Sequence, residues 1–454
     1  MATQLDSVKR IHCIGAGGCS MSGIAEILAA QGHSITGSDR EPSPFTEKLA
    51  RIGIPVTIGQ KEENAYGAEA VIYSAAIKPD NPERIWAREH GLPEIERSVA
   101  LGQLSERFSE VVAIAGCHGK TTISSMLAYI DAEAQLNATL HIGGYVELLD
   151  GGVKVGSGRL LITEACEYVR SFLTLRPTVA LINNIDNDHL DCYRDIGEII
   201  ETFGKFCALV PEGGTLILCT DDKNVRTLLP SLSRPFRTYG LSEGDVHAAD
   251  IAYDSEGCPS FTLVDEGKPL GRIELHVPGT HNVVNALAAY SAAKVCGAEF
   301  APIAKALARF KNTKRRFEYM GMRNGVSVYH DYGHHPNEIA CTLEAASRMP
   351  HKALYCVFQC NSYTRARTLF CENVTCFAGA DRVLVPDIYP GREKDTGAVH
   401  ARDMVNGINR ASNNALYLEN FENIRAWIDE NARPGDLVVT LGSGNVYAQT
   451  QKLL

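Results

Sequence analysis

Short apolar runs alternate with helix-like patterns from the start of the chain. In the first 110 residues the predicted strands are 11–14, 34–39 and 70–74, and the predicted helices are 20–30 and 101–110. Strands that alternate with helices predict a parallel sheet, which binds its ligands at the carboxyl ends of the strands.

The same alternation continues through two further blocks. The second block has predicted strands at 111–115, 160–163 and 178–182, a predicted helix at 281–295, and hairpin or meander insertions at 143–158 and 245–277. The third block has predicted strands near 327–331, 353–358, 382–386 and 436–441. The pattern predicts three α/β domains in series, over residues 1–107, 108–312 and 313–454.

The length and composition agree with this architecture and narrow the function. A chain of 454 residues has room for about three domains, and 45% hydrophobic with 22% charged residues is ordinary for a globular protein. The net charge of −10 argues against a nucleic-acid partner. No apolar run approaches the roughly 20 residues that span a bilayer, and the N-terminus lacks a signal-peptide pattern. We therefore expect a cytoplasmic protein without membrane insertion.

The 14 cysteines are the unusual feature of the composition. Disulfide frameworks belong to small secreted domains, and no two cysteines here have the CxxC spacing of a zinc finger. We expect most of them to be reduced and buried as small hydrophobic side chains.

A glycine-rich turn follows the first predicted strand. Gly15, Gly17 and Gly18 would let a pyrophosphate approach the backbone at a helix N-terminus, and Asp39 ends the next strand, where a carboxylate can accept a ribose hydroxyl. Ser20 stands where a dinucleotide fingerprint has its third glycine, so the pattern is incomplete. Taken alone, the turn is compatible with NAD, with a UDP-sugar, or with a tight turn that binds nothing.

A shortened phosphate-binding loop follows the strand at 111–115. Its residues are Gly116, Cys117, His118, Gly119, Lys120, Thr121 and Thr122. Glycines expose backbone N–H groups to phosphate, Lys120 offers a positive charge to the β- and γ-phosphates, and Thr121 is a ligand for Mg²⁺. The favoured ligand is a nucleoside triphosphate with magnesium.

Polar side chains at later strand and helix ends extend this hypothesis. Glu164 and His189 follow the next two predicted strands and suit a magnesium site, although a run of turn-forming residues is the alternative. Asn282 and Asn285 lie three apart at a helix start, where amides can read a purine edge or cap the helix. Arg316 belongs to a basic patch that suits a phosphoryl group or is a solvated linker.

Two strand ends in the third block are rich in polar residues. Asp331, Tyr332 and His334 follow one predicted strand, and Arg365 follows another. Polar groups at neighbouring strand ends converge on one crevice. Zinc binding by the adjacent histidines is the weaker alternative, because no third ligand stands at a recognisable spacing.

The order of these motifs, across essentially the whole chain, resembles the Mur ligase family of peptidoglycan synthesis. The matching stretches are IHCIGAGGCSMSGIAEIL (11–28), GCHGKTT (116–122), NNIDNDHLD (183–191), PGTHNVVNALAA (278–289), KRRFE (314–318), DYGHHPNE (331–338) and SYTRAR (362–367). The first stretch and DYGHHP are most similar to the members that add L-alanine. The resemblance implies an N-terminal Rossmann-like UDP-binding domain, a central P-loop ATPase-type domain with a mainly parallel sheet, and a C-terminal Rossmann-like domain.

The resemblance also implies a reaction and a set of site residues. ATP would phosphorylate the lactyl carboxylate of UDP-N-acetylmuramate, and L-alanine would attack the acyl phosphate, with ATP and Mg²⁺ as cofactors and a monomer or weak homodimer as the working form. The implied catalytic residues are Lys120, Glu164, His189, Arg316, Asp331, His334 and Arg365. The implied ATP contacts are Gly116, Cys117, His118, Gly119, Lys120, Thr121, Thr122, Asn282, Asn285, Arg316 and Asp331, and the implied metal ligands are Thr121, Glu164 and His189. The implied UDP contacts are Gly15, Gly17, Gly18, Ser20, Asp39 and Ser74, and the implied amino-acid contacts are Tyr332, His334 and Arg365.

Three positions depart from the family pattern and leave alternatives open. Cys117 replaces a threonine, Cys166 replaces an acidic residue, and Asn361 replaces a histidine. The alternatives are a ligase of the same family that recycles murein peptides, an NAD-dependent oxidoreductase, and a catalytically silent nucleotide-binding scaffold. Cys117, Cys166 and Cys360 all lie inside the inferred active-site motifs. Their thiols predict sensitivity to alkylation, with ATP protecting Cys117.

Overall fold

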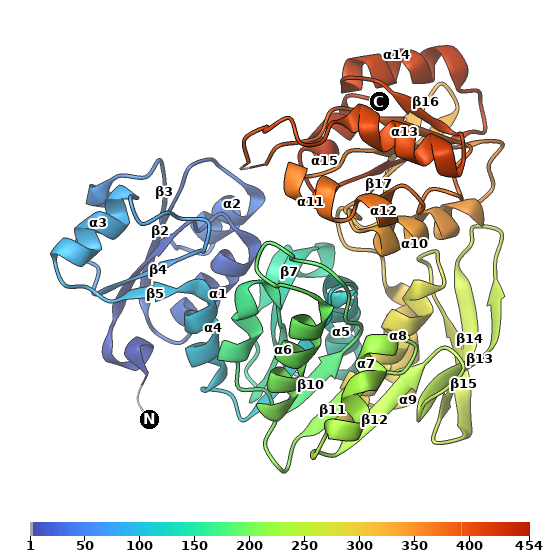
Figure 1. Ribbon diagram of the computed structural model, residues 1–454. Helices are drawn as coiled ribbons and strands as arrows, with labels where there is room; N and C mark the ends of the chain where they lie inside the picture. The colour runs from blue at the N-terminus through green and yellow to red at the C-terminus, as the bar shows by residue number, and fades with distance from the viewer. Residues whose placement is uncertain (1–2, 392) are drawn as a thin grey trace.

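The computed structural model describes residues 3–391 and 393–454. Its three sheets belong to three α/β domains, and the central domain lies between the other two (Figure 1). The prediction of three α/β units in series is therefore confirmed. Within the described residues, no helix has the length and apolar character needed to cross a membrane.

The N-terminal domain is a five-stranded parallel sheet with helices packed against it. The strand order is β3-β2-β1-β4-β5, with bounds Val56–Ile58, Ser34–Asp39, Arg10–Ile14, Ala70–Tyr73 and Glu94–Glu96. The helices are η1 (Gln4–Ser7), α1 (Cys19–Ala30), α2 (Pro44–Arg51), η2 (Glu62–Ala65), α3 (Pro82–Glu89) and α4 (Arg97–Ser105). Strand β1 pairs with β2 on one side and with β4 on the other, so the strand order reverses at β1. Open α/β sheets bind ligands at the carboxyl ends of the strands beside such a reversal.

The central domain has a ten-stranded sheet in the order β15-β14-β13-β12-β11-β10-β6-β9-β7-β8. The strands are β6 (Glu110–Ala115), β7 (Thr139–Val146), β8 (Gly151–Lys154), β9 (Leu160–Glu164), β10 (Val179–Ile182), β11 (Thr215–Cys219), β12 (Phe236–Gly240), β13 (Val246–Tyr253), β14 (Pro259–Asp265) and β15 (Lys268–Glu274). The helices are α5 (Lys120–Ala134), η3 (Glu147–Leu149), η4 (Tyr168–Thr174), α6 (Ile196–Ala208), α7 (Lys223–Leu228), η5 (Leu229–Ser231), α8 (His281–Val295) and α9 (Phe300–Arg309). The β7–β8 hairpin and the β13–β15 meander are antiparallel additions to a parallel centre, so both predicted insertions are confirmed.

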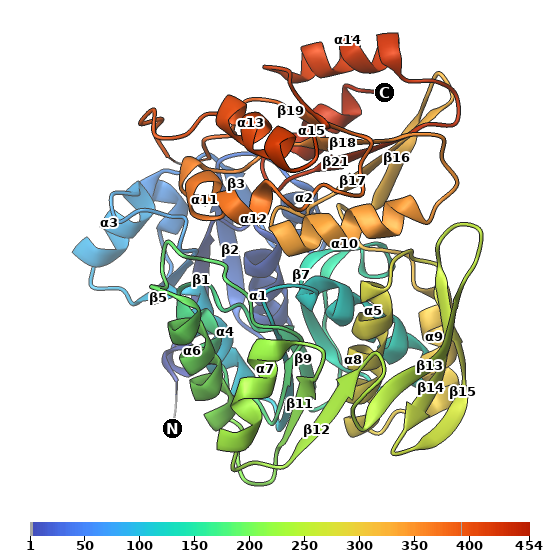
Figure 2. The same ribbon diagram turned by 45° about the vertical axis from the view of Figure 1, so that its right-hand side comes forward.

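The C-terminal domain has a six-stranded sheet in the order β16-β17-β21-β18-β19-β20, parallel except for β16. The strands are β16 (Glu318–Arg323), β17 (Val326–Asp331), β18 (Leu354–Phe358), β19 (Arg382–Val385), β20 (Ala415–Tyr417) and β21 (Leu437–Leu441). The helices are α10 (Pro336–Ser347), α11 (Tyr363–Thr368), α12 (Phe370–Asn373), α13 (Ala401–Ala411), α14 (Phe421–Asn431) and α15 (Val446–Gln451). Both views place α10 on the side of this domain that is turned toward the central domain (Figures 1 and 2).

The helix predicted over 101–110 is wrong at both ends. The helix begins at Arg97, where the Glu96 side chain accepts a hydrogen bond from the Ser98 N–H and caps it, and it ends at Ser105. Glu110 is already in β6, where it pairs with Leu160. Glu106 and Arg107 form a turn after Ser105, and the mostly polar residues before β6 carry no apolar periodicity that would mark where the helix ends.

Candidate active site

The phosphate loop connects the end of β6 to the first turn of α5. Gly116 has φ +140° and Gly119 has φ +84°, which are conformations that favour glycine. A Cβ on Gly119 would lie 2.6 Å from Asn183 Nδ2 and 2.7 Å from Asn285 Oδ1. The loop therefore packs directly against the end of β10 and the start of α8, with no room for a side chain between them.

Lys120 is held in a buried ion pair. Its Nζ lies 2.7 Å from Glu167 Oε2 and 3.3 Å from the Cys117 carbonyl oxygen, and it also donates to the Gly116 carbonyl. The Glu167 side chain is only 2% exposed, and its other oxygen lies 3.2 Å from His189 Nε2. Burial alone would lower the pKa of Lys120, but the Glu167 charge raises it above its usual value. Lys120 is therefore positively charged at the mouth of the loop.

Thr121 and Glu164 place oxygen atoms side by side at the start of α5. The Thr121 hydroxyl donates to Glu164 Oε2 at 3.2 Å, and the Gly143 N–H donates to Glu164 Oε1 at 2.7 Å. Burial raises the pKa of Glu164 above its ordinary range. A hydroxyl and a carboxylate next to a phosphate loop fit Mg²⁺, which prefers oxygen ligands and keeps several waters. His189, the third predicted metal ligand, is instead paired with Glu167, the partner of Lys120.

His118, Asp186 and His335 have ligand atoms within 4.8 Å of one another, as a metal site would require. Although burial lowers it, two flanking carboxylates, Glu338 and Asp186, raise the pKa of His118 to about 10. A protonated imidazole has no lone pair for a metal, and Mg²⁺ takes oxygen ligands. This group is therefore an ion-pair cluster at neutral pH, and the residues that fit magnesium are Thr121 and Glu164.

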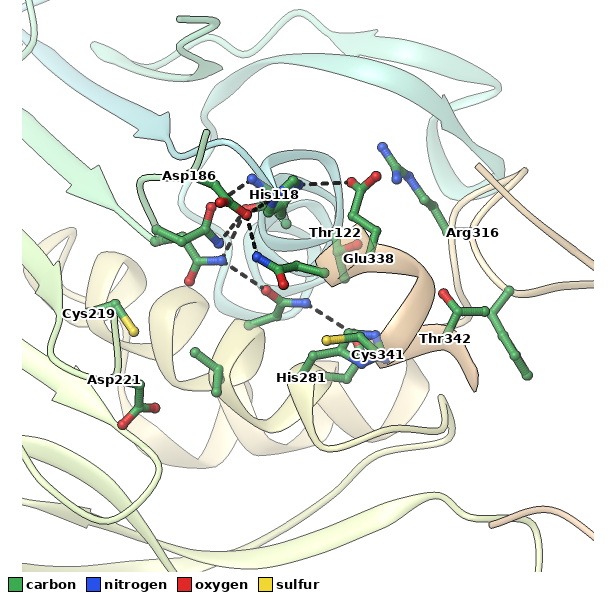
Figure 3. A pocket seen from close by; sticks show the side chains of 18 of the residues that line it. His118, Thr122, Asp186, Cys219, Asp221, His281, Arg316, Glu338, Cys341 and Thr342 are labelled. Atoms are coloured by element: carbon green, nitrogen blue, oxygen red, sulfur yellow. Dashed lines mark hydrogen bonds and ion pairs between the residues drawn. The ribbon is translucent and has the colours of Figure 1, made fainter. Parts of the chain in front are cut away.

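A cavity of about 310 Å³ lies between the central and C-terminal domains (Figure 3). Predicted ATP contacts that line it are His118, Gly119, Thr122, Asn282, Asn285, Arg316 and Asp331. Asn285 Nδ2 donates to Asn282 Oδ1 at 3.1 Å, and Asn282 Nδ2 donates to the Pro278 carbonyl at 2.7 Å, so the two amides form a fixed pair. The size and mixed lining suit a small molecule such as a nucleotide.

Asp331 lines this cavity and holds the neighbouring backbone of the C-terminal domain in place. Its carboxylate accepts hydrogen bonds from the Gly333 N–H at 2.6 Å and the Phe317 N–H at 2.8 Å. Burial raises the pKa of Asp331. The Arg316 guanidinium lies 5.0 Å from the Tyr332 ring centroid, on the side of the cavity near Glu338 (Figure 3).

A second cavity, of about 790 Å³, is lined by residues from all three domains. Arg40 comes from the N-terminal domain, His189 from the central domain, and Tyr332 and Arg365 from the C-terminal domain. Arg365 Nη2 lies 3.2 Å from Asp188 Oδ1, so its charge bridges the central and C-terminal domains. The structure brings the predicted amino-acid contacts Tyr332 and Arg365 to the same cavity as the predicted metal ligand His189.

His334 lies beside this cavity, with its ring centroid 5.3 Å from that of Tyr332. Its Nδ1 lies 3.1 Å from the Tyr332 carbonyl oxygen. Burial lowers the pKa of His334 to about 4, so its imidazole is neutral at physiological pH.

The glycine turn of the N-terminal domain gathers most of the predicted UDP contacts. Gly17 N–H donates to Asp39 Oδ2 at 2.8 Å, and a Cβ on Gly15 would lie 3.5 Å from Ser74 Oγ. Gly18 N–H donates to the Gly15 carbonyl. The Ser20 side chain instead contacts the central domain.

Three family models match the chain in sequence order. They are the catalytic domain of the Mur ligase family at residues 10–109, the Mur ligase middle domain at 114–293 and the glutamate ligase domain at 315–444. A curated UDP-N-acetylmuramate–L-alanine ligase from Caldanaerobacter subterraneus subsp. tengcongensis is 42% identical over 100% of this chain and 99% of its own. The ligase of the same name from Clostridium botulinum strain Okra is 40% identical over 97% and 96%. This chain belongs to the Mur ligase family. Its predicted domain ends at 107 and 312 stay predictions.

Solved Mur ligase structures have the same fold. A UDP-N-acetylmuramate–alanine ligase from Thermotoga maritima superposes with a TM-score of 0.81, at 24% identity and with 98% of each chain covered. A murein peptide ligase from Psychrobacter arcticus superposes with a TM-score of 0.72, again at 24% identity and 98% coverage of each chain. These likenesses confirm the three-domain fold of this Mur ligase.

The site of this Mur ligase includes residues to which the motifs assigned no role. They are Glu167, Asp186, Asp188 and Glu338, the partners of Lys120, His118, Arg365 and His118 respectively. Asp186, Asp188 and Glu338 lie inside the stretches that resemble the family, and Glu167 follows Cys166, which departs from the family pattern; these positions were the available signal. Their partners were hidden because each pair joins segments that are distant along the chain.

His141 joins the N-terminal and central domains through Ser20. Its Nε2 lies 3.1 Å from Ser20 Oγ, its Nδ1 lies 3.1 Å from Thr163 Oγ1, and Ser20 Oγ also accepts from Arg97. The residue is 3% exposed, and burial lowers its pKa from 6.5 to about 4.

We therefore expect the free energy of unfolding to decrease in acid because His141 is buried as a neutral imidazole. As pH drops below 6.5 the unfolded chain takes up the proton before the folded chain does, so the free energy of unfolding decreases by about 1.4 kcal/mol per pH unit until about pH 4. Urea unfolding at pH 7 and pH 5 should show a smaller pH difference for His141→Gln than for the unsubstituted enzyme. Equal differences in the two proteins would contradict a neutral, buried His141.

The thiol predicted to be protected by ATP is itself only partly exposed. Cys117 Sγ accepts from the Asp186 N–H at 3.1 Å, and burial raises the pKa of Cys117 well above its usual value. Burial likewise raises the pKa of Cys166 to about 11 and that of Cys360 to about 12. Because the thiolate is the nucleophile, these three thiols are slow to alkylate.

Cys341 is the better reporter of nucleotide binding. It is solvent-exposed and lines the 310 Å³ cavity, although burial raises its pKa to about 11. Its advantage over the partly exposed Cys117 is access to the reagent. Iodoacetamide at pH 8.5 should modify Cys341 before Cys117, and ATP should slow the modification at Cys341 while leaving exposed Cys371 unaffected. Peptide mass spectrometry measures all three rates, and faster labelling of Cys117 than of Cys341 would refute this ranking.

Proposed function

We propose that this Mur ligase joins L-alanine to the lactyl carboxylate of UDP-N-acetylmuramate, while ATP is cleaved to ADP and phosphate. The observation that carries the proposal is the near full-length similarity to curated relatives of that name. The geometry agrees, since a nucleotide-sized cavity and a larger cavity lie on either side of the loop that contains Asp186, Asp188 and His189. A cytoplasmic location and a monomer or weak homodimer belong to the same proposal.

The first chemical step brings two anions together. A lactyl carboxylate oxygen attacks the γ-phosphorus of ATP, the bond from that phosphorus to the β–γ bridging oxygen breaks, and ADP leaves. Such a transition state needs fixed positive charge around the transferred phosphoryl group. Lys120, at the loop, and Arg316, from the C-terminal domain, supply it. Mg²⁺ held by Thr121 and Glu164 would further neutralise the phosphate oxygens.

The second step forms the amide. The neutral amine of L-alanine attacks the acyl carbon, and the tetrahedral intermediate collapses as the carbon–oxygen bond to phosphate breaks. Arg365 offers a charge for the alanine carboxylate, and its pairing with Asp188 fixes its position. His334 stays neutral at physiological pH and can accept the proton that the attacking amine loses. Both side chains come from the C-terminal domain, so this step requires that domain to be docked.

A phosphate-release assay over donors and acceptors tests the proposal. Release should require ATP, Mg²⁺, UDP-N-acetylmuramate and L-alanine together, and NAD should not alter it. Equal or faster release with the murein tripeptide L-alanyl-γ-D-glutamyl-meso-diaminopimelate in place of L-alanine would assign the chain to the peptide-recycling branch instead. ATP binding without release under any combination would leave a silent scaffold.

A further inference from the structure

The His118 imidazole lies between two carboxylates that belong to different domains. Its Nε2 is 2.9 Å from Asp186 Oδ2 in the central domain, and its Nδ1 is 3.1 Å from Glu338 Oε1 in α10 of the C-terminal domain (Figure 3). The exposed fractions of the His118, Asp186 and Glu338 side chains are only 14–20%. The phosphate loop is thus connected to the C-terminal domain by a direct, poorly solvated contact.

Glu338 makes contacts on both sides of the boundary between the central and C-terminal domains. It is the third residue of α10, and its Oε2 accepts hydrogen bonds from the backbone N–H groups of His334 at 3.0 Å and His335 at 3.2 Å. Those bonds cap the helix start and leave Oε1 for His118. One carboxylate therefore links the start of α10 to the phosphate loop.

Asp186 provides a second contact across the same boundary. Its Oδ2, which faces His118, also accepts a hydrogen bond from Asn337 Nδ2 at 2.6 Å. His335 Nδ1 lies 3.4 Å from the same oxygen. The helix cap His335 and two residues in the first turn of α10, Asn337 and Glu338, thus contact the central domain at one cluster.

The cluster is ionic at physiological pH. The pKa of His118 is raised to about 10 by Glu338 and Asp186 despite the effect of burial, whereas burial and the neighbouring His118 charge lower the pKa of His335. One imidazolium thus faces two carboxylates, and hydrogen bonds between ionised groups are stronger than neutral ones.

The cluster also forms part of the nucleotide cavity. His118, Asp186, Asn337 and Glu338 all line it, together with Cys341 one turn further along α10. A nucleotide that orders the phosphate loop therefore also orders the side chain that Glu338 binds. By linkage, docking of the C-terminal domain should improve ATP affinity by the factor by which ATP favours docking.

We propose that His118 is a positioning residue which couples ATP binding to docking of the C-terminal domain through its ion pair with Glu338. The coupling rests on the proposed function only in taking ATP as the nucleotide. The coupling explains how the phosphate loop reaches its ATP-binding arrangement only when Tyr332, His334 and Arg365 are positioned to bind the amino-acid acceptor. Premature cleavage of ATP in an undocked enzyme would thereby be limited.

The test compares His118→Gln, Glu338→Gln and the double variant with a matched control. Glutamine at 338 keeps one oxygen for the α10 cap and replaces the charged oxygen that faces His118 by an uncharged NH2 group. The control is Glu344→Gln on the same helix, whose Oε1 lies 3.3 Å from Thr280 Oγ1 of the central domain and which does not line the cavity. The affinity for a non-hydrolysable ATP analogue is measured by calorimetry, and the radius of gyration of the nucleotide-free enzyme by small-angle X-ray scattering.

Each single variant should bind the analogue about tenfold or more weakly and have a larger radius of gyration. The double variant should be no more than about threefold weaker than the worse single one, because both changes break one interaction. Glu344→Gln should stay within about twofold. In phosphate-release assays the loss of rate in each single variant should be larger at subsaturating than at saturating ATP, which a loop that was merely misfolded would not show.

Unchanged affinity in Glu338→Gln, or fully additive losses in the double variant, would overturn the coupling. Either result can be read from binding alone, without turnover. An unsubstituted enzyme that binds the ATP analogue but fails to ligate L-alanine would defeat the proposed function and leave this test intact.

Discussion

Lys120→Ala is expected to lower ATP-dependent phosphate release by about 1000-fold, because it removes the loop cation from the transferring phosphoryl group. The same change leaves the Glu167 carboxylate, 2% exposed, without its lysine partner and with only His189 Nε2 at 3.2 Å. Removing one partner of a buried ion pair costs about 3 kcal/mol or more. The variant should therefore lose both activity and stability, as measured by initial rates and urea unfolding.

A second substitution separates these two effects. Glu167→Gln in the Lys120→Ala background removes the unpaired charge, so it should restore much of the lost stability while leaving the rate at the level of the single variant. If the double variant instead recovers phosphate release, Lys120 acts on Glu167 rather than on the nucleotide, and the assignment of the loop cation is wrong.

Glu164→Gln is expected to lower the rate about 100-fold at limiting Mg²⁺ and to raise the Mg²⁺ concentration needed for half-maximal activity. The carboxylate lies 3.2 Å from the Thr121 hydroxyl, so the change removes a negative oxygen from the pair that fits magnesium and changes little volume. The measurement is phosphate release across a Mg²⁺ titration.

Glu212→Gln, at an exposed position of the same domain, is the control for this titration and should leave the curve unchanged. An unaltered Mg²⁺ dependence in Glu164→Gln would exclude Glu164 as a magnesium ligand. It would direct attention to Glu167, which lies between Lys120 and His189.

Local patterns predicted the elements that position the chemistry. The apolar run at 111–115 and the glycines that follow it require a strand, a turn with positive φ and a helix start, and β6 and α5 meet there as expected. The predicted helix at 281–295 has the bounds of α8. Short strands such as β3 and β20, of three residues each, carry too few side chains for a periodic pattern and were missed.

Contacts between domains could not be predicted, because no local pattern encodes how two domains dock. Ser20 looked like a substituted glycine of a nucleotide turn, yet its hydroxyl lies against His141 of the central domain. His118 was predicted only as an ATP contact in the phosphate loop, yet its ring is held by Asp186 and by Glu338 of the C-terminal domain. In both cases the residue type suited a contact whose partner becomes known only when the domains are assembled.

The most direct test of the account follows oxygen and alanine in one reaction. UDP-N-acetylmuramate labelled with ¹⁸O in its lactyl carboxylate is incubated with ATP, Mg²⁺, L-alanine and the enzyme, and the products are analysed by mass spectrometry. The account predicts UDP-N-acetylmuramoyl-L-alanine together with phosphate that carries one labelled oxygen, since the carboxylate oxygen leaves with the γ-phosphoryl group. Unlabelled phosphate, or a nucleotide product without alanine, would contradict it.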